Sequence, residues 1–181
     1  MAQLPYADLN APELQPLVER IVAGRGSVLH LYQMLLHSPP LAAGWLELMT
    51  QVRQKLDLGG DLRELVIMRI AHVNGAPYEA EQHAPIALRE GLSQAQLDAL
   101  PAWADAPAGL YSPLQCDVLR LCDTMTREVQ VPPPRVQAVR ARLGDRQLVE
   151  LVATIASYNM VSRFLEALQI HGDDPRPADA G

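Results

Sequence analysis

Signals that start and stop helices recur along the whole chain and constrain its fold more than any other feature. Two Ser-x-x-Gln sequences, Ser93–Gln96 and Ser112–Gln115, have the form of a capping box, in which side chains satisfy free backbone groups at a helix start. Pro39 suits a first helical turn, and Gly91 and Gly144 are typical helix stops. No run alternates apolar and polar residues between hairpin turns, as strands would. The sequence therefore predicts an all-α fold, a bundle of about seven or eight helices around one core.

The length and composition are those of one soluble globular domain. The chain has 181 residues, of which 49% are hydrophobic and 20% charged, enough to bury a sizeable core. We expect a single domain over residues 1–172. The last segment, DDPRPADAG, is rich in Pro and Asp, so a disordered tail is predicted over 173–181.

Charge and hydropathy exclude several kinds of partner. The net charge of -6 argues against nucleic acid, because phosphate binding needs a basic face. No uninterrupted apolar run approaches the ~18 residues that a membrane span needs. The first residues, MAQLPYADLN, contain neither the basic nor the apolar part of a signal peptide, so we expect a cytoplasmic protein.

The two cysteines, Cys116 and Cys122, lie in one predicted helix. Six residues of helix rise by about 9 Å, whereas a disulfide needs Cα atoms within about 7 Å. No Cys-x-x-Cys motif occurs in the chain. We therefore expect no internal disulfide, and we interpret Cys122 as a core residue.

One carboxylate, Glu64, is set into the apolar run LRELVIMRIAHV. At about 100° per residue it shares a helical sector with Ile67, whereas Arg63 and Arg69 lie outside that sector. Burial there would raise the pKa of Glu64 and make it a usable proton donor or acceptor. An alternative stays open, in which Glu64 is the third-position partner of Asp61 in a variant capping box.

The next predicted helix carries Glu79 and His83 one turn apart, on one face. Pro85 follows, and a proline inside a helix removes a backbone hydrogen bond and favours a kink. A single histidine is more often an ordinary surface or core residue than a catalytic one. The residues alone therefore leave a structural and a catalytic role for His83 open.

The stretch RELVIMRIAHVNGAPYEAEQHAPIALREGLS resembles the core of the carboxymuconolactone decarboxylase and alkylhydroperoxidase D superfamily. In the peroxidase branch the motif is Glu, eleven residues, Cys-x-x-Cys, three residues and His, often with Tyr before the second Cys. Glu64, Tyr78 and His83 occupy their places in this motif. Ala76 and Glu79 stand where the two cysteines would be.

The resemblance covers roughly residues 27–170, including the closing helix ELVATIASYNMVSRFLEAL. It implies an alkylhydroperoxidase D-like fold in which Glu64 and His83 face one pocket between two packed helices. Members with cysteines use Glu and His as a proton relay to form a thiolate, and without a thiol the pair can still move protons. Glu79 would hold the His83 tautomer or raise its pKa, and Tyr78 completes the candidate catalytic set.

The favoured function is a cofactor-free decarboxylase or related lyase acting on a small carboxylated or lactone substrate. His83 or Glu64 would donate the proton to the carbon that loses CO₂. An arginine would bind a substrate carboxylate through two hydrogen bonds, and the candidates are Arg69, Arg89 and Arg163.

Two functions of other classes stay open. A thiol peroxidase is disfavoured because both motif cysteines are missing, and a non-catalytic module would keep the fold for oligomerisation or ligand binding. A metal site built from His72, Glu79 and His83 is also disfavoured, because the spacing matches no known zinc pattern.

Apolar surface predicts self-association. The segments LHLYQMLLH, LAAGWLELM and VATIASYNMV carry more apolar faces than a small bundle readily hides. We expect a homo-oligomer, and superfamily members form dimers, trimers and hexamers. Asn159 within the last segment must find hydrogen bonds once buried, and we interpret it as a structural tie between helices.

Overall fold

The chain is helical throughout the part that the structure describes. The computed structural model describes residues 1–175, and these form α-helices and two short 3₁₀ helices without any β-strand. The elements are η1 (Pro12–Leu14), α1 (Gln15–Arg25), α2 (His30–Leu35), α3 (Pro39–Gln54), α4 (Gly60–Asn74), α5 (Pro77–Arg89), α6 (Gln94–Ala99), η2 (Leu100–Asp105), α7 (Pro113–Arg127) and α8 (Pro133–Leu168). The predicted all-α class and helix number are confirmed.

Local capping chemistry sets the start of two helices. Ser93 and Ser112 each accept a hydrogen bond from the backbone amide three residues on, and the Gln96 and Gln115 side chains accept one from the serine's own amide. Both predicted capping boxes are therefore confirmed. At α3, Pro39 occupies the first turn, but the Ser38 side chain makes no capping hydrogen bond.

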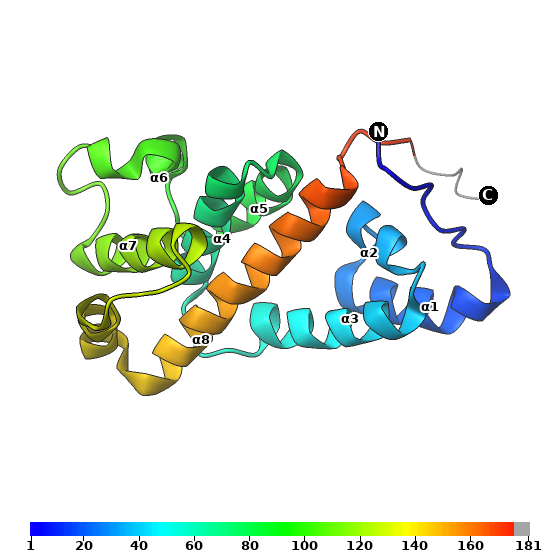
Figure 1. Cartoon of the computed structure of the whole chain (residues 1–181), viewed down its shortest axis with the longest axis horizontal. Coiled ribbons are helices and arrows are strands. Elements are labelled where there is room, and N and C mark those ends of the chain that lie inside the picture. The colour runs from blue at the N-terminus through cyan, green and yellow to red at the C-terminus, as the bar shows by residue number, and fades with distance from the viewer. Residues whose placement is uncertain (176–181) are drawn as a thin grey trace. The chain divides into compact units, whose positions relative to one another are not determined.

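The chain divides into two compact units. The first comprises Met1–Lys55 and the C-terminal residues from Leu165, and the second comprises Leu56–Phe164. In the first unit α1 and α2 pack against α3, and in the second α4 packs against α5 and α7 (Figure 1). The expectation of one domain over residues 1–172 stays a prediction.

The central element of the second unit is α4, which is buried on nearly all sides. Leu65, Val66, Ile67 and Ile70 have no exposed surface, and a helix that is apolar all round belongs in a core. Two charged side chains of α4 are also buried there, and each must find compensating partners.

The last helix, α8, is interrupted once. Gly144 has a φ of 77°, a left-handed conformation that glycine adopts without steric cost, and the predicted helix boundary there is confirmed. The helix is long and apolar enough to cross a membrane by length and composition alone. Half of its most apolar 18-residue window is buried inside the structure, which is typical of a core helix.

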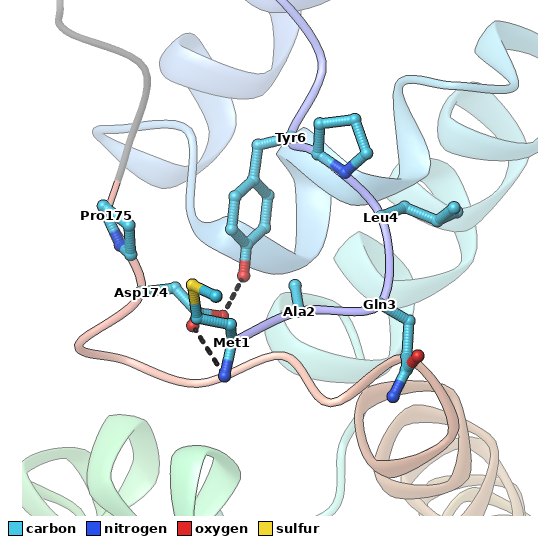
Figure 2. A pocket seen from close by; sticks show the side chains of 8 residues that line it. Met1, Ala2, Gln3, Leu4, Tyr6, Asp174 and Pro175 are labelled. Carbon is cyan, nitrogen blue, oxygen red and sulfur yellow. Dashed lines mark hydrogen bonds and ion pairs between the residues drawn. The ribbon is translucent and has the colours of Figure 1, made fainter.

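The buried Asp174 carboxylate connects the N-terminal and C-terminal segments of the first unit. Asp174 accepts a hydrogen bond from the Tyr6 hydroxyl at 2.7 Å and lies 3.7 Å from the Met1 amino group (Figure 2). Asp174 therefore makes defined contacts within the predicted tail, and the tail's last residues, 176–181, lie outside the described part. A pocket of about 440 Å³ adjoins these contacts and is lined by residues 1–6, Asp174 and Pro175.

Candidate functional site

Glu64 and His83 form a direct hydrogen bond inside the second unit. His83 Nδ1 lies 2.7 Å from Glu64 Oε2, which joins α4 to α5. Glu64 is 1% exposed and His83 is 7% exposed. The prediction that these two side chains meet is confirmed, whereas their catalytic role stays a prediction.

Arg63 gives the Glu64 carboxylate a second partner. Its Nε donates to Glu64 Oε1 at 3.0 Å. Burial raises the pKa of Glu64, but the hydrogen bond and charge of His83 and then those of Arg63 lower it more, and the pKa lies below its usual value. The expectation that the pKa of Glu64 is raised was therefore wrong. It considered only the effect of burial, and it placed Arg63 outside the helical sector of Glu64.

The ionised state of Glu64 fixes the His83 tautomer. An ionised carboxylate only accepts hydrogen bonds, so the proton of this bond belongs to His83 Nδ1. In the neutral imidazole Nε2 is then the nitrogen with the lone pair, which is the atom that can take or give a proton during a reaction.

The capping role considered for Glu64 is not realised. The N-cap of α4 is Gly59, which has no side chain, and α4 has no side-chain capping hydrogen bond. Both oxygens of Glu64 bond to other groups, one to His83 and one to Arg63. Of the two interpretations left open by the sequence, the structure contradicts the capping role, and it shows that Glu64 contacts His83 instead.

The other two residues of the predicted catalytic set lie at the start of α5. Tyr78 is 4% exposed and Glu79 is 2% exposed. Glu79 shares the buried face of α5 with His83, as predicted, but the carboxylate at Nδ1 is that of Glu64. Pro85 lies inside α5, and the helix continues past it to Arg89.

Tyr158 of α8 also contacts His83 within this unit. The Tyr158 and His83 rings meet edge to face, with centroids 5.1 Å apart and planes at 88°. Such contacts favour one ring orientation. Sequence reasoning did not assign Tyr158 to the site, because a contact between distant helices has no local signal.

Two of the three predicted substrate-binding arginines form hydrogen bonds with other residues of the fold. Arg69 is 4% exposed and donates through Nε and Nη2 to Asp123 at 2.6 and 2.9 Å. Arg163 donates to the side chain of Asn159. The geometry does not support substrate binding by Arg69, because its guanidinium also bonds the carbonyls of Leu100 and Pro101. The third, Arg89, is exposed at the end of α5.

Asn159 ties three helices together, as predicted. Its Nδ2 donates to Thr126 Oγ1 on α7 at 3.0 Å, and its Oδ1 accepts from Asn74 Nδ2 on α4 at 3.1 Å. This buried amide is thereby satisfied, and it holds α8 against the helix that carries Glu64.

Neither cysteine is placed for thiolate chemistry at this site. Both are free thiols, and Cys122 is fully buried on α7. Burial, and after it the nearby Asp123 carboxylate, raise the pKa of the Cys122 thiol well above its usual range. The expected absence of a Cys116–Cys122 disulfide is confirmed, and Cys122 is a core residue as predicted.

The metal-ligand combination considered in the sequence does not assemble. Within residues 1–175, no group of three or more His, Cys, Asp or Glu side chains is arranged to hold a metal ion. His72 is exposed on α4, whereas Glu79 and His83 are buried on α5.

The lowered pKa of Glu64 predicts how its contribution to the stability of the fold changes with pH. A carboxyl group whose folded-state pKa is lowered stabilises the fold above its unfolded pKa, near 4.5, and this contribution is lost as the pH falls through the folded value. We expect Glu64→Gln to lower the free energy of unfolding by about 2 kcal/mol at pH 6, and by progressively less below pH 4.5. Urea unfolding against pH measures this, with the exposed Glu19→Gln as control; a pH-independent difference would contradict it.

Comparisons with known proteins agree with this geometry. The model of the Carboxymuconolactone decarboxylase family matches residues 39–111, a segment that includes Glu64 and His83. The Uncharacterized protein YdfG of Bacillus subtilis (strain 168) is 28% identical over 108 residues, which are 59% of this chain and 72% of YdfG.

Two solved structures share the fold at low identity. An uncharacterized peroxidase-related protein with an alkylhydroperoxidase AhpD core, from Ralstonia eutropha JMP134, has a TM-score of 0.80 and 16% identity, covering 96% of this chain and 93% of its own. A cysteine-to-alanine variant of the debrominase Bmp8, in complex with 2,3,4-tribromopyrrole, has a TM-score of 0.75 and 15% identity, covering 96% and 94%. The family match over residues 39–111 and the shared fold confirm the resemblance drawn from the sequence to the carboxymuconolactone decarboxylase and AhpD-like superfamily, and in this chain the two motif-cysteine positions hold Ala76 and Glu79.

Proposed function

We propose that the chain is a cofactor-free acid–base enzyme that decarboxylates, or otherwise cleaves, a small carboxylated or lactone substrate. The observation that carries this proposal is the buried hydrogen bond from His83 Nδ1 to Glu64 Oε2 at 2.7 Å. A carboxylate that holds one imidazole nitrogen leaves the other as a proton carrier, an arrangement that general acid–base catalysis uses repeatedly.

The proposed reaction balances without a cofactor if the substrate can hold an electron pair. The bond between the carboxylate carbon and its neighbour breaks, CO₂ leaves, and the electron pair passes into a conjugated carbonyl of the substrate as an enolate. His83 takes a proton from solvent at Nε2, gives it to the carbon and returns to the neutral imidazole, and Glu64 stabilises the imidazolium between these two transfers. Arg89 remains the candidate for binding a second substrate carboxylate, because its guanidinium makes no hydrogen bond to residues 1–175 and is exposed.

A substrate panel tests the proposal directly. The purified protein would be incubated with small carboxylated lactones and 3-oxo acids, and CO₂ release would be followed. In D₂O we expect one deuterium at the carbon that loses CO₂. Turnover without deuterium at that carbon, or no turnover of any carboxylated substrate, would reject proton delivery to a decarboxylated carbon.

A thiol peroxidase is the main competing function, since the Ralstonia eutropha neighbour is named peroxidase-related. We expect no cysteine-dependent turnover, because the motif places hold Ala76 and Glu79 and the Cys122 thiol is buried. Peroxide consumption with a thiol reductant should be equal in the wild type and in Cys116→Ala/Cys122→Ala. Activity that disappears in the double variant would favour the peroxidase. A protein that binds ligands of the panel without converting them would instead be a non-catalytic module.

A homo-oligomer is also part of the proposal. Leu41 and Leu48 lie two turns apart on α3 and are 49% and 46% exposed, and exposed apolar side chains on one helix face favour a partner. We expect light scattering at micromolar concentration to give a multiple of 19.9 kDa, and Leu41→Lys/Leu48→Lys to reduce it. Val149→Lys, at an exposed position on α8, is the control. A monomeric wild type would contradict the prediction.

A further inference from the structure

Arg63 lies between two carboxylates of very different exposure. Its Nε donates to Glu64 Oε1 at 3.0 Å, and its Nη2 lies 3.0 Å from Glu90 Oε1. The Glu64 side chain is 1% exposed and that of Glu90 is 40% exposed. Arg63 therefore links the buried carboxylate that holds His83 to a carboxylate at the surface.

Gly60 leaves room for this connection. A Cβ atom added to Gly60 would overlap the Glu90 carboxylate, so Glu90 occupies space that any other residue at the first position of α4 would fill. Glu90 itself is the C-cap residue of α5. The chain of contacts thus joins the start of the helix that carries Glu64 to the end of the helix that carries His83.

The charge of Arg63 decides which protonation state the pair can hold. A buried carboxylate needs a compensating positive charge. If His83 were the only compensating group, the pair would favour an imidazolium that gives up its proton less readily to a substrate carbon. A guanidinium keeps its charge at all pH values relevant to proteins, so with Arg63 present Glu64 can stay ionised while His83 is neutral.

We propose that Arg63 is a positioning residue for His83. By holding Glu64 Oε1 and balancing its charge, Arg63 keeps Oε2 as the acceptor for Nδ1 of a neutral imidazole and leaves Nε2 as the proton-carrying nitrogen. Glu90 anchors Arg63 in this position. The importance of Arg63 for turnover rests on the acid–base function proposed above. Its effect on the protonation of His83 can be measured without a substrate.

The other groups around His83 in the second unit stay unchanged in the test. They include Glu64 on α4, Glu79 on the same face of α5 and Tyr158 on α8. Because Arg63 and Glu90 can be replaced without altering any of these side chains, a change at the imidazole reports the Arg63 connection.

Nuclear magnetic resonance of ring-¹⁵N histidine gives the readout, with the His83 signals assigned from a His83→Gln sample. In the wild type we expect a neutral imidazole with its proton on Nδ1. In Arg63→Met we expect the Glu64–His83 pair to take up its proton about one pH unit higher, because a like charge near the imidazole is removed. Glu90→Asp keeps the negative charge but shortens the reach to Arg63 Nη2, and it should shift the midpoint in the same direction by less. The control Arg140→Met removes an arginine from an exposed ion pair with Asp145 and should leave the midpoint unchanged.

The results separate this inference from the proposed function. An unchanged His83 tautomer and midpoint in a folded Arg63→Met protein would overturn the positioning role. If Arg63→Met does not fold, Glu90→Asp decides, since the half-exposed Glu90 side chain is shortened at little structural cost and its charge is kept, and an unchanged midpoint there overturns the role. A shifted midpoint in a protein that converts no carboxylated substrate would support Arg63 as a positioning residue and reject the decarboxylase alone.

Discussion

Replacing Arg69 by methionine is expected to lower the free energy of unfolding by about 3–5 kcal/mol. Arg69 makes a two-pronged ion pair with Asp123, at 2.6 and 2.9 Å, between α4 and α7. Methionine would leave the Asp123 carboxylate without its main compensating charge. It would also leave the carbonyls of Leu100 and Pro101 without the donor that Arg69 Nη1 supplies, and unsatisfied buried groups each cost free energy.

Urea unfolding of the variant and the wild type measures this loss, and two further variants locate its cause. Arg69→Lys keeps the charge but cannot reproduce the two-pronged geometry, so we expect a smaller loss. Arg69→Met/Asp123→Leu removes both charges, and we expect it to recover part of the stability because no uncompensated carboxylate remains. A double variant no more stable than Arg69→Met would show that the cost lies in the carbonyls or in packing.

The scale of this loss follows from the position of Arg69. Domains of this size are stable by about 5–15 kcal/mol in total, so the ion pair is a large fraction of what holds α4 against α7. Four of the five N–H donors of Arg69 are committed in this way, so the side chain cannot supply the two donors that bidentate binding of a substrate carboxylate needs. For this reason the residue type alone did not predict correctly that Arg69 would bind substrate.

The features that sequence reasoning predicted well are those with local causes. The capping boxes at Ser93 and Ser112 depend on residues three positions apart, and the break at Gly144 depends on the conformational freedom of one residue. The Glu64–His83 contact came from a spacing shared with a known family. Each of these signals lies within a short stretch of chain.

The features that were missed depend on packing between distant segments or on long flexible side chains. Arg69 is paired with a residue 54 positions away, and Tyr158 reaches His83 from another helix. Arg63 lies outside the Glu64 sector on a helical wheel, but its long side chain turns back to the neighbouring carboxylate. A wheel places Cβ atoms, and it cannot place a charged group several bonds beyond them. The direction of the Glu64 pKa shift was missed for this reason.

Replacing His83 by glutamine is expected to lower turnover of any substrate found in the panel by about 10²–10⁴-fold, the range that general acid–base groups contribute. A glutamine amide can still donate to Glu64, so the buried carboxylate keeps a hydrogen-bond partner and the fold is retained. The amide cannot carry a proton between substrate and solvent at neutral pH. The loss should therefore appear in kcat, with little change in substrate affinity measured by calorimetry.

The matched control for this prediction is His72→Gln. His72 is on α4 like Glu64 but is exposed, and burial of part of its ring, with the charge of Arg69, lowers its pKa below the usual value. A histidine whose only role is on the surface should change turnover by less than about threefold, since surface substitutions are usually worth less than about 0.5 kcal/mol. Equal kcat values for His83→Gln and the wild type would remove His83 as the proton carrier. A loss of affinity without a loss of kcat would assign it to substrate binding instead, leaving Glu64 as the group that holds it in place.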